Sequence, residues 1–217
     1  MWDEWGSTIF VIGVILFFGW FVAGMWWNLR KGNASLRWLR EGLPAIGERT
    51  TMRWLGTSVV EMKIAKAKDP FRNAETLFVF EPRDVALLWA IARARGRRDL
   101  MIFRAQLRSA PAFELEAIAP KAWTTQGIAR NVRGKNWTQL DPGLPELETY
   151  YSGAAGATAS KAMIDLAQSV GAKLVRVSVH RTVPNLEVHW HLPDPYGAPA
   201  RDLFSKLRQM SEIAMRG

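Results

Sequence analysis

An uncharged, apolar stretch near the N-terminus constrains this chain more than any other feature. Residues Thr8–Trp27 form a run of 20 residues without a charged side chain. As a helix rising about 1.5 Å per residue, the run is about 30 Å long, the hydrocarbon thickness of a bilayer. Tryptophans, which favour the headgroup level, flank it on both sides: Trp2 and Trp5 before it, Trp26 and Trp27 at its end. The sequence therefore predicts a transmembrane helix over residues 8–27.

A cleaved signal peptide and a buried helix of a soluble domain are the two alternatives for this stretch. A signal peptide has a basic segment before a shorter apolar core, whereas this chain has Asp3 and Glu4 there and no Lys or Arg. Val22-Ala23-Gly24 is a poor match to a signal-peptidase site. Buried helices of soluble proteins are seldom apolar on every face over such a length. We therefore favour a retained anchor.

The charges around the span predict its orientation. All 29 Lys and Arg residues follow the span. The nearest lie where positive charge sets topology: Arg30, Lys31, Arg37 and Arg40. We therefore expect a short external tail at residues 1–7, the span in the cell membrane, and the remaining chain in the cytoplasm.

The 190 residues after the span are strongly basic. Their 29 Lys and Arg outnumber the 18 Asp and Glu that follow the span, which gives a net charge of +11. Near a membrane, each basic side chain close to anionic headgroups contributes about 1 kcal/mol of attraction. Nucleic acid is the other polyanion that such a charge favours. The chain has no cysteine, which excludes disulfides, thiol nucleophiles and thiolate-bound metals.

The segment 28–44 is basic and amphipathic. Leu36, Leu39 and Leu43 recur at helical spacing, and Trp38 lies beside them. A helix lying on the inner leaflet and a linker helix packed on the soluble domain explain this pattern equally well. In the first case Trp38 is a further membrane-interface anchor.

Hydrophobic periodicity in the remaining residues predicts an α+β domain of mainly antiparallel hairpins with three packed amphipathic helices. Val60, Met62 and Ile64, for example, alternate with charged residues as in a strand with one wet face. We expect three parts: residues 45–118 as ββαββ, residues 119–157 as an irregular connector and residues 158–217 as αββα.

Two tertiary details are expected in the first half. A hairpin around Ser109–Pro111 would place Arg104 opposite Glu116 and so pair opposite charges. The helix predicted over residues 85–96 is too short to cross a membrane. Its Trp89 is expected to point into the core.

All three histidines fall in one predicted hairpin, residues 173–192. One face of it has four possible metal ligands: His180, Glu187, His189 and His191. Pairing Val183 with Leu186 places His180 opposite His189. His-x-His on a strand with a third His or a carboxylate suits Zn²⁺ or another divalent ion. A solvated polar face, which we favour, and a histidine-lined partner interface are the other interpretations.

Two further groups of residues are candidates for contacts outside the chain. A second basic cluster could, together with the juxtamembrane cations, bind phosphate of lipid or nucleic acid: Arg93, Arg95, Arg97 and Arg98. A helix C-terminus followed by a solvated turn explains this cluster as well, and we favour that interpretation. Within the span, Gly19 and Ala23 form a small-xxx-small pair that permits close packing of another helix.

No nucleophile and base, or acid and base, stand at a recognisable catalytic spacing. We therefore expect a single-pass, membrane-anchored, non-catalytic accessory or scaffold protein without a cofactor. Its basic cytoplasmic domain would dock a protein partner, such as another membrane protein or a second copy, or the anionic membrane surface. One alternative is a membrane-anchored, metal-dependent hydrolase that uses the His/Glu cluster. A second, less favoured alternative is a membrane-tethered nucleic-acid-binding domain that depends on Arg97 and Arg98.

Overall fold

The computed structural model describes residues 2–141, 143–154 and 156–216. The strands are β1 (Thr50–Trp54), β2 (Val59–Ile64), β3 (Phe71–Val79), β4 (Leu100–Leu107), β5 (Glu114–Ile118), β6 (Thr138–Leu140), β7 (Glu148–Ser152), β8 (Leu174–Val179) and β9 (Leu186–His191). The helices are α1 (Trp2–Gly42), α2 (Ala86–Ala94), α3 (Gln126–Arg133), α4 (Gly156–Gln168) and α5 (Ala200–Arg216), with a short 3-10 turn at Leu43–Ala45.

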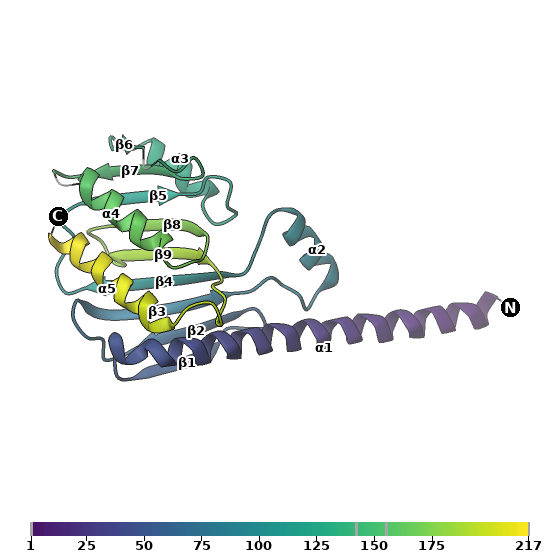
Figure 1. Cartoon of the computed structure of the whole chain (residues 1–217). Helices are drawn as coiled ribbons and strands as arrows, with labels where there is room; N and C mark the ends of the chain where they lie inside the picture. The colour runs from purple at the N-terminus through teal and green to yellow at the C-terminus, as the bar shows by residue number, and fades with distance from the viewer. Residues whose placement is uncertain (1, 142, 155, 217) are drawn as a thin grey trace.

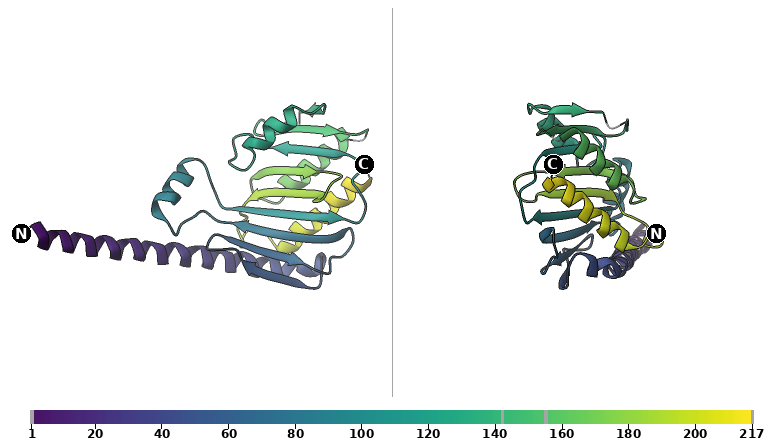
Figure 2. Two further views of the ribbon diagram at one scale, coloured as in Figure 1. Left: turned by 180° about the vertical axis from the view of Figure 1, so that it is seen from behind. Right: turned by 60° about the vertical axis from the view of Figure 1, so that its left-hand side comes forward.

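The predicted α+β class is confirmed. Among the described residues, nine strands form one antiparallel sheet in the order β1-β2-β3-β4-β9-β8-β5-β7-β6. Helices α4 and α5 and the C-terminal part of α1 cover one face of this sheet (Figure 1), and the views of Figure 2 show the same layering. On the other face, no helix of the described residues covers β1–β4 (Figure 2), and the polar side chains of this face form part of the candidate site.

Helix α1 is one continuous rod, so the predicted span and the segment 28–44 are not separate helices. Its N-terminal half extends away from the sheet, and its C-terminal part lies beside α5 (Figure 1). The extended half contains an apolar stretch that is long enough to cross a membrane. Leu36 and Leu39 are buried in the domain. In the structure, segment 28–44 is thus a helix packed on the domain, the second of its two interpretations.

Trp38 is not the membrane-interface anchor that a helix lying on the inner leaflet would require. Its side chain is buried in the core, and its Nε1 donates a hydrogen bond of 2.6 Å to the carbonyl oxygen of Ala198. A tryptophan on an amphipathic helix suits a core as well as a headgroup region, because its ring is apolar and its N–H needs an acceptor.

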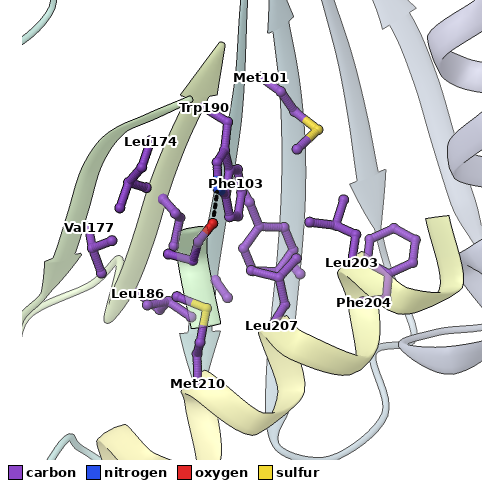
Figure 3. Packing of buried hydrophobic residues seen from close by; sticks show 14 of the residues in the cluster. Met101, Phe103, Leu174, Val177, Leu186, Trp190, Leu203, Phe204, Leu207 and Met210 are labelled. Atoms are coloured by element: carbon purple, nitrogen blue, oxygen red, sulfur yellow. Dashed lines mark hydrogen bonds between the residues drawn. The ribbon is translucent and has the colours of Figure 1, made fainter. Parts of the chain in front are cut away.

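Large apolar side chains from the sheet and from α5 form the centre of the core. Phe103 and Trp190 project from β4 and β9 toward Phe204 and Leu207 of α5 (Figure 3). The indole Nε1 of Trp190 donates a hydrogen bond of 2.8 Å to the carbonyl oxygen of Ala167 in α4. The alternation of apolar residues along the strands therefore predicted correctly which side chains of the sheet face the core.

Strands β4 and β5 do not form the predicted hairpin. Strands β9 and β8 lie between them in the sheet. Arg104 of β4 consequently lies opposite Glu187 of β9 instead of Glu116 of β5. The expected charge pairing is satisfied, but by a strand that is distant in the sequence. By contrast, β8 and β9 do form the predicted hairpin.

The segment 119–157, expected to be an irregular connector, contributes α3, β6 and β7. Strand β5 pairs with both β7 and β8, so strands from both predicted halves share one sheet. The short strand β1 was not predicted either. Strands of three to five residues are too short to show a clear period of two.

Helix α2 does not pack on the sheet, so only two of the three predicted amphipathic helices do so as expected. It lies in the connection between β3 and β4 and extends sideways from α1 (Figure 1). None of the described residues of α2 is buried. Trp89 does not point into the core but lies against Trp20 of α1, with ring centroids 5.8 Å apart.

Candidate functional site

A group of polar side chains with a buried centre joins α1 to the sheet, and we call it the junction cluster: Asn28, Lys31, Glu81, Arg83 and Asp99. Asp99 is its centre. Its carboxylate accepts hydrogen bonds of 2.9 and 3.0 Å from the two terminal nitrogens of Arg83 and one of 2.7 Å from Lys31 Nζ. Asn28 donates to the carbonyl oxygen of Glu81 at 3.0 Å and accepts from Arg83 at 2.9 Å.

The junction cluster holds its central carboxylate in the ionised form. Burial alone would raise the pKa of Asp99, but hydrogen bonds from Arg83 and Lys31 outweigh it and lower the pKa. Asn28 and Lys31 belong to α1, whereas Arg83 and Asp99 belong to the connections at the ends of β3 and β4. Because bidentate charged hydrogen bonds are directional, the cluster fixes the rotation and position of α1 relative to the sheet.

A close backbone contact lies next to the junction cluster. A Cβ atom on Gly24 would lie 2.0 Å from the carbonyl oxygen of Arg83, so only glycine fits there. Trp20 Nε1 donates a hydrogen bond of 2.9 Å to the same oxygen. Gly19 is different, since among the described residues nothing lies within 4 Å of a Cβ placed there, and Ala23 is exposed. Packing of another helix on Gly19 and Ala23 stays a prediction.

We expect Gly24→Ala to lower the free energy of unfolding by about 1–3 kcal/mol, because its methyl group would force the Arg83 backbone to move. Gly19→Ala adds the same methyl group to the same helix without a clash. It should leave stability unchanged or slightly higher, since alanine favours helix. Thermal denaturation of both variants and the parent in one detergent measures the difference. Equal melting temperatures for the two variants would contradict the close packing at Gly24.

The sheet face opposite the helices has a row of ion pairs, which we call the open-face network: Glu75, Arg104, Glu116, Arg176, Ser178, His180, Glu187 and His189. Glu187 accepts hydrogen bonds from Arg104 Nε at 2.6 Å and from Arg176 Nη1 at 2.5 Å. It also contacts His189 Nε2 at 2.7 Å. Glu116 holds Arg176 from the other side, at 2.7 and 3.1 Å, and contacts His180 Nε2 at 2.8 Å.

The network keeps its carboxylates ionised. Burial of Glu187 opposes ionisation, but the hydrogen bond from His189 and the charges of Arg176 and Arg104 lower its pKa to about 2. Burial lowers the pKa of His189, which is therefore neutral at pH 7. The hydrogen bond to Glu116 raises the pKa of His180. The two central carboxylates of the network, Glu116 and Glu187, are therefore ionised in the folded protein.

The four predicted metal ligands do not converge. The β8–β9 register differs from the predicted one, so Val179 pairs with Leu186, and Arg176 instead of His180 lies opposite His189. His180 and His189 are bound to different glutamates, Glu116 and Glu187. His191 lines a separate pocket with Lys173 and Arg98. Within residues 2–141, 143–154 and 156–216, no three His, Asp or Glu side chains are placed to hold a metal ion.

An open groove of about 820 Å³, which we call the open-face groove, lies beside the open-face network. Its walls come from β1 to β4 and from the β8–β9 turn: Thr51, Arg53, Glu61, Lys63, Ile64, Ala65, Asn73, Ala74, Glu75, Arg104, Ala105, Gln106, Val183, Pro184 and Glu187. Glu61 accepts a hydrogen bond of 2.6 Å from Arg53 and lies 3.4 Å from Lys63 Nζ. The groove thus presents both signs of charge together with backbone and amide groups.

The juxtamembrane basic residues have different surroundings. Arg37 and Arg40 are exposed on α1. Arg30 is exposed and lies over the ring of Trp26, 5.3 Å from its centroid. Lys31 is engaged in the junction cluster. Three of the four cations are therefore exposed to solvent, and contact of these residues with phosphate stays a prediction.

The second basic cluster is partly engaged within the chain. Arg93 contacts Glu81 at 3.2 Å and lies over the ring of Trp89. Arg98 donates to backbone carbonyl oxygens, and Arg97 lies over the ring of Trp123, 4.6 Å from its centroid. Arg95, at the end of α2, is exposed. These contacts agree with the favoured interpretation as a helix end and turn, and phosphate binding stays a prediction.

Three of the predicted interface tryptophans are more than half exposed on α1: Trp5, Trp26 and Trp27. The side chain of Trp2 lies outside what the structure describes. The exposed positions are those that a headgroup-level indole requires.

The candidate site thus has three parts: the exposed apolar half of α1, the junction cluster, and the open-face network with its groove. A comparison with protein-family models gives no match, and neither does a comparison with curated proteins. The chemistry of these three parts is therefore the basis for the proposed function.

Proposed function

We propose that this chain is a single-pass, membrane-anchored, non-catalytic accessory protein. Its N-terminal side lies outside the cell, and its α+β domain lies in the cytoplasm and docks a protein partner in the open-face groove. The exposure of the apolar half of α1 is the observation that supports this most strongly. Only 6 % of its most apolar 18-residue window is buried, whereas a core helix would be mostly buried.

The free energy of this exposed surface favours a bilayer over water. Phe10, Leu16 and Phe17 are each more than half exposed, as are most of their neighbours on α1. Removing one such side chain from water contributes about 1.5–3 kcal/mol. The helix projects from the domain along most of its apolar length (Figure 1), so a lipid environment is the natural way to cover it.

Contacts between the span and the domain favour retention of the span over cleavage. Trp20 and Gly24, which lie inside the predicted span, touch Arg83 and Trp89 of the domain. A signal peptide is removed before the mature protein folds and has no such partners. The exposed cations Arg30, Arg37 and Arg40 follow the span, which supports a cytoplasmic domain.

The open-face network supports a docking role in preference to catalysis. A general acid or base works best with a pKa near the working pH. Glu187, with a pKa of about 2, does not meet this condition, and His180 and His189 are each held by a glutamate of the network. Ordered side chains of both signs beside a groove offer directional hydrogen bonds to a polar protein segment.

We expect Phe17→Arg to disrupt membrane insertion, because an arginine at the centre of a span costs about 2.5–3.5 kcal/mol. Phe17 is 59 % exposed, so the substitution removes little packing inside the protein. Val183→Arg is the matched control, since Val183 is 62 % exposed on the β8–β9 turn. Alkaline carbonate extraction of membranes measures the membrane-bound fraction. Loss of that fraction in Phe17→Arg alone is expected, and full retention of both variants would contradict the anchor.

A further inference from the structure

Helix α2 has an apolar face that nothing in the described chain covers. Leu87, Leu88 and Ile91 are 69, 54 and 41 % exposed. Their spacing places them on one side of the helix. A helix of nine residues without buried residues is marginally stable in water. An apolar environment on that face would therefore stabilise the helix.

The position of α2 along α1 indicates what that environment is. Trp89 of α2 lies against Trp20, which is seven residues before the end of the predicted span. Seven residues of helix correspond to about 10 Å along the axis. An amphipathic helix at a membrane surface buries its apolar face about 5–10 Å into the headgroup and acyl boundary. Trp89 thus lies about 10 Å inside the inner end of the predicted span, at the deep end of this range.

The direction and charge of α2 suit the same surface. In Figures 1 and 2, α2 extends sideways from α1 instead of running along it. Helix α2 contains no acidic residue. Its Arg93 turns back toward Glu81 of the domain, at 3.2 Å, and Trp89 Nε1 donates a hydrogen bond of 2.7 Å to the same carboxylate. Polar contacts therefore face the domain while Leu87 and Leu88 face away from it.

We propose that α2 is a second membrane contact, in which the face formed by Leu87, Leu88 and Ile91 inserts into the same leaflet as the inner end of α1. This inference rests on the proposed anchoring by α1. The continuity of the two apolar surfaces through the Trp20–Trp89 contact supports lipid as the occupant. The junction cluster ties α1 and the base of α2 to one sheet. The membrane contacts of α1 and α2 together therefore fix the orientation of the sheet relative to the bilayer. The strands then run away from the membrane, and the open-face groove stays accessible from the side.

Spin labels at single cysteines test this inference, because the chain has no native cysteine. Nitroxides are attached to full-length Leu88→Cys, Phe17→Cys and Val183→Cys proteins in nanodiscs of phosphatidylcholine and phosphatidylglycerol. Collisions with oxygen, which partitions into lipid, are compared with collisions with a water-soluble nickel complex. We expect oxygen to dominate and nickel accessibility to be lost at Leu88 and Phe17. Nickel should dominate at Val183, an exposed apolar residue on the β8–β9 turn.

The outcomes separate this inference from the proposed anchor. Nickel access at Leu88 with lipid-like values at Phe17 would overturn the α2 contact and leave the anchor intact. Nickel access at Phe17 would overturn the anchor itself. A label at Leu88 that is shielded from both reagents would indicate a protein neighbour and would also overturn the lipid contact. Leu87→Cys on the same face provides a second reading if Leu88→Cys does not fold.

Discussion

Replacement of Asp99 with alanine is expected to lower the free energy of unfolding by about 3–5 kcal/mol, the usual cost of removing one partner from a buried ion pair. Arg83, whose side chain is 15 % exposed, would lose both hydrogen bonds to the carboxylate, and Lys31 would lose its salt bridge. The backbone N–H of Glu81 would also lose its 2.8 Å acceptor. Denaturant unfolding in mild detergent, followed by tryptophan fluorescence, measures the loss.

Asp69→Ala is the matched control for this prediction. Asp69 is paired with Arg108, but its side chain is 78 % exposed. Exposed ion pairs contribute about 0–1 kcal/mol, so this variant should remain close to the parent. Equal destabilisation by the two substitutions would mean that the junction cluster does not hold α1 in place.

Glu187→Gln is expected to have an effect of similar size, about 3–5 kcal/mol, because it leaves two arginines beside an uncharged amide. Arg104 and Arg176 both bind this carboxylate, and Arg176 is largely buried. Glu75→Gln removes another carboxylate beside Arg104, at 3.8 Å, from a more exposed position. The control should cost about 1 kcal/mol or less. Similar losses in both variants would contradict the central place of Glu187 in the network.

The contribution of Glu187 depends on pH in a defined direction. Its pKa is lowered from 4.5 to about 2 in the folded protein. Its stabilising effect is therefore fully present above the unfolded value and is lost as the pH falls through the folded value. The difference in unfolding free energy between the parent and Glu187→Gln should shrink across this range. A difference that stays constant during acidification would contradict the assignment.

Strand faces could be predicted from the sequence, because a sheet face depends only on a period of two. Leu186, Val188 and Trp190 face the core as the alternation requires. The β8–β9 register differs from the predicted pairing by an even number of residues, so Glu187 and His189 stay on the polar face. The same difference separates His180 from His189. The composition of the polar face was therefore predictable, but the proximity of its members was not.

Non-local pairing and the placement of helices could not be predicted from the sequence. Arg104 is complementary to Glu116 and to Glu187 alike, and only the topology selects Glu187. The apolar pattern of α2 fits a core helix and a membrane-surface helix equally well. The junction cluster was missed because its members are far apart in the chain. Its faint signal was Asn28, a polar residue directly after the apolar run, which is fully buried.

The most direct test of the account is the membrane topology of the intact chain. Trp5→Cys and Ser109→Cys proteins are treated in whole cells with a membrane-impermeant maleimide, and the mass of the membrane-purified product is measured. Ser109 is exposed on the connection between β4 and β5 and does not line the groove. We predict an uncleaved chain that is labelled at residue 5 before lysis and at residue 109 only after lysis. Labelling of residue 109 in whole cells, or a mass that lacks the apolar segment, would contradict a retained span with the sheet domain inside the cell.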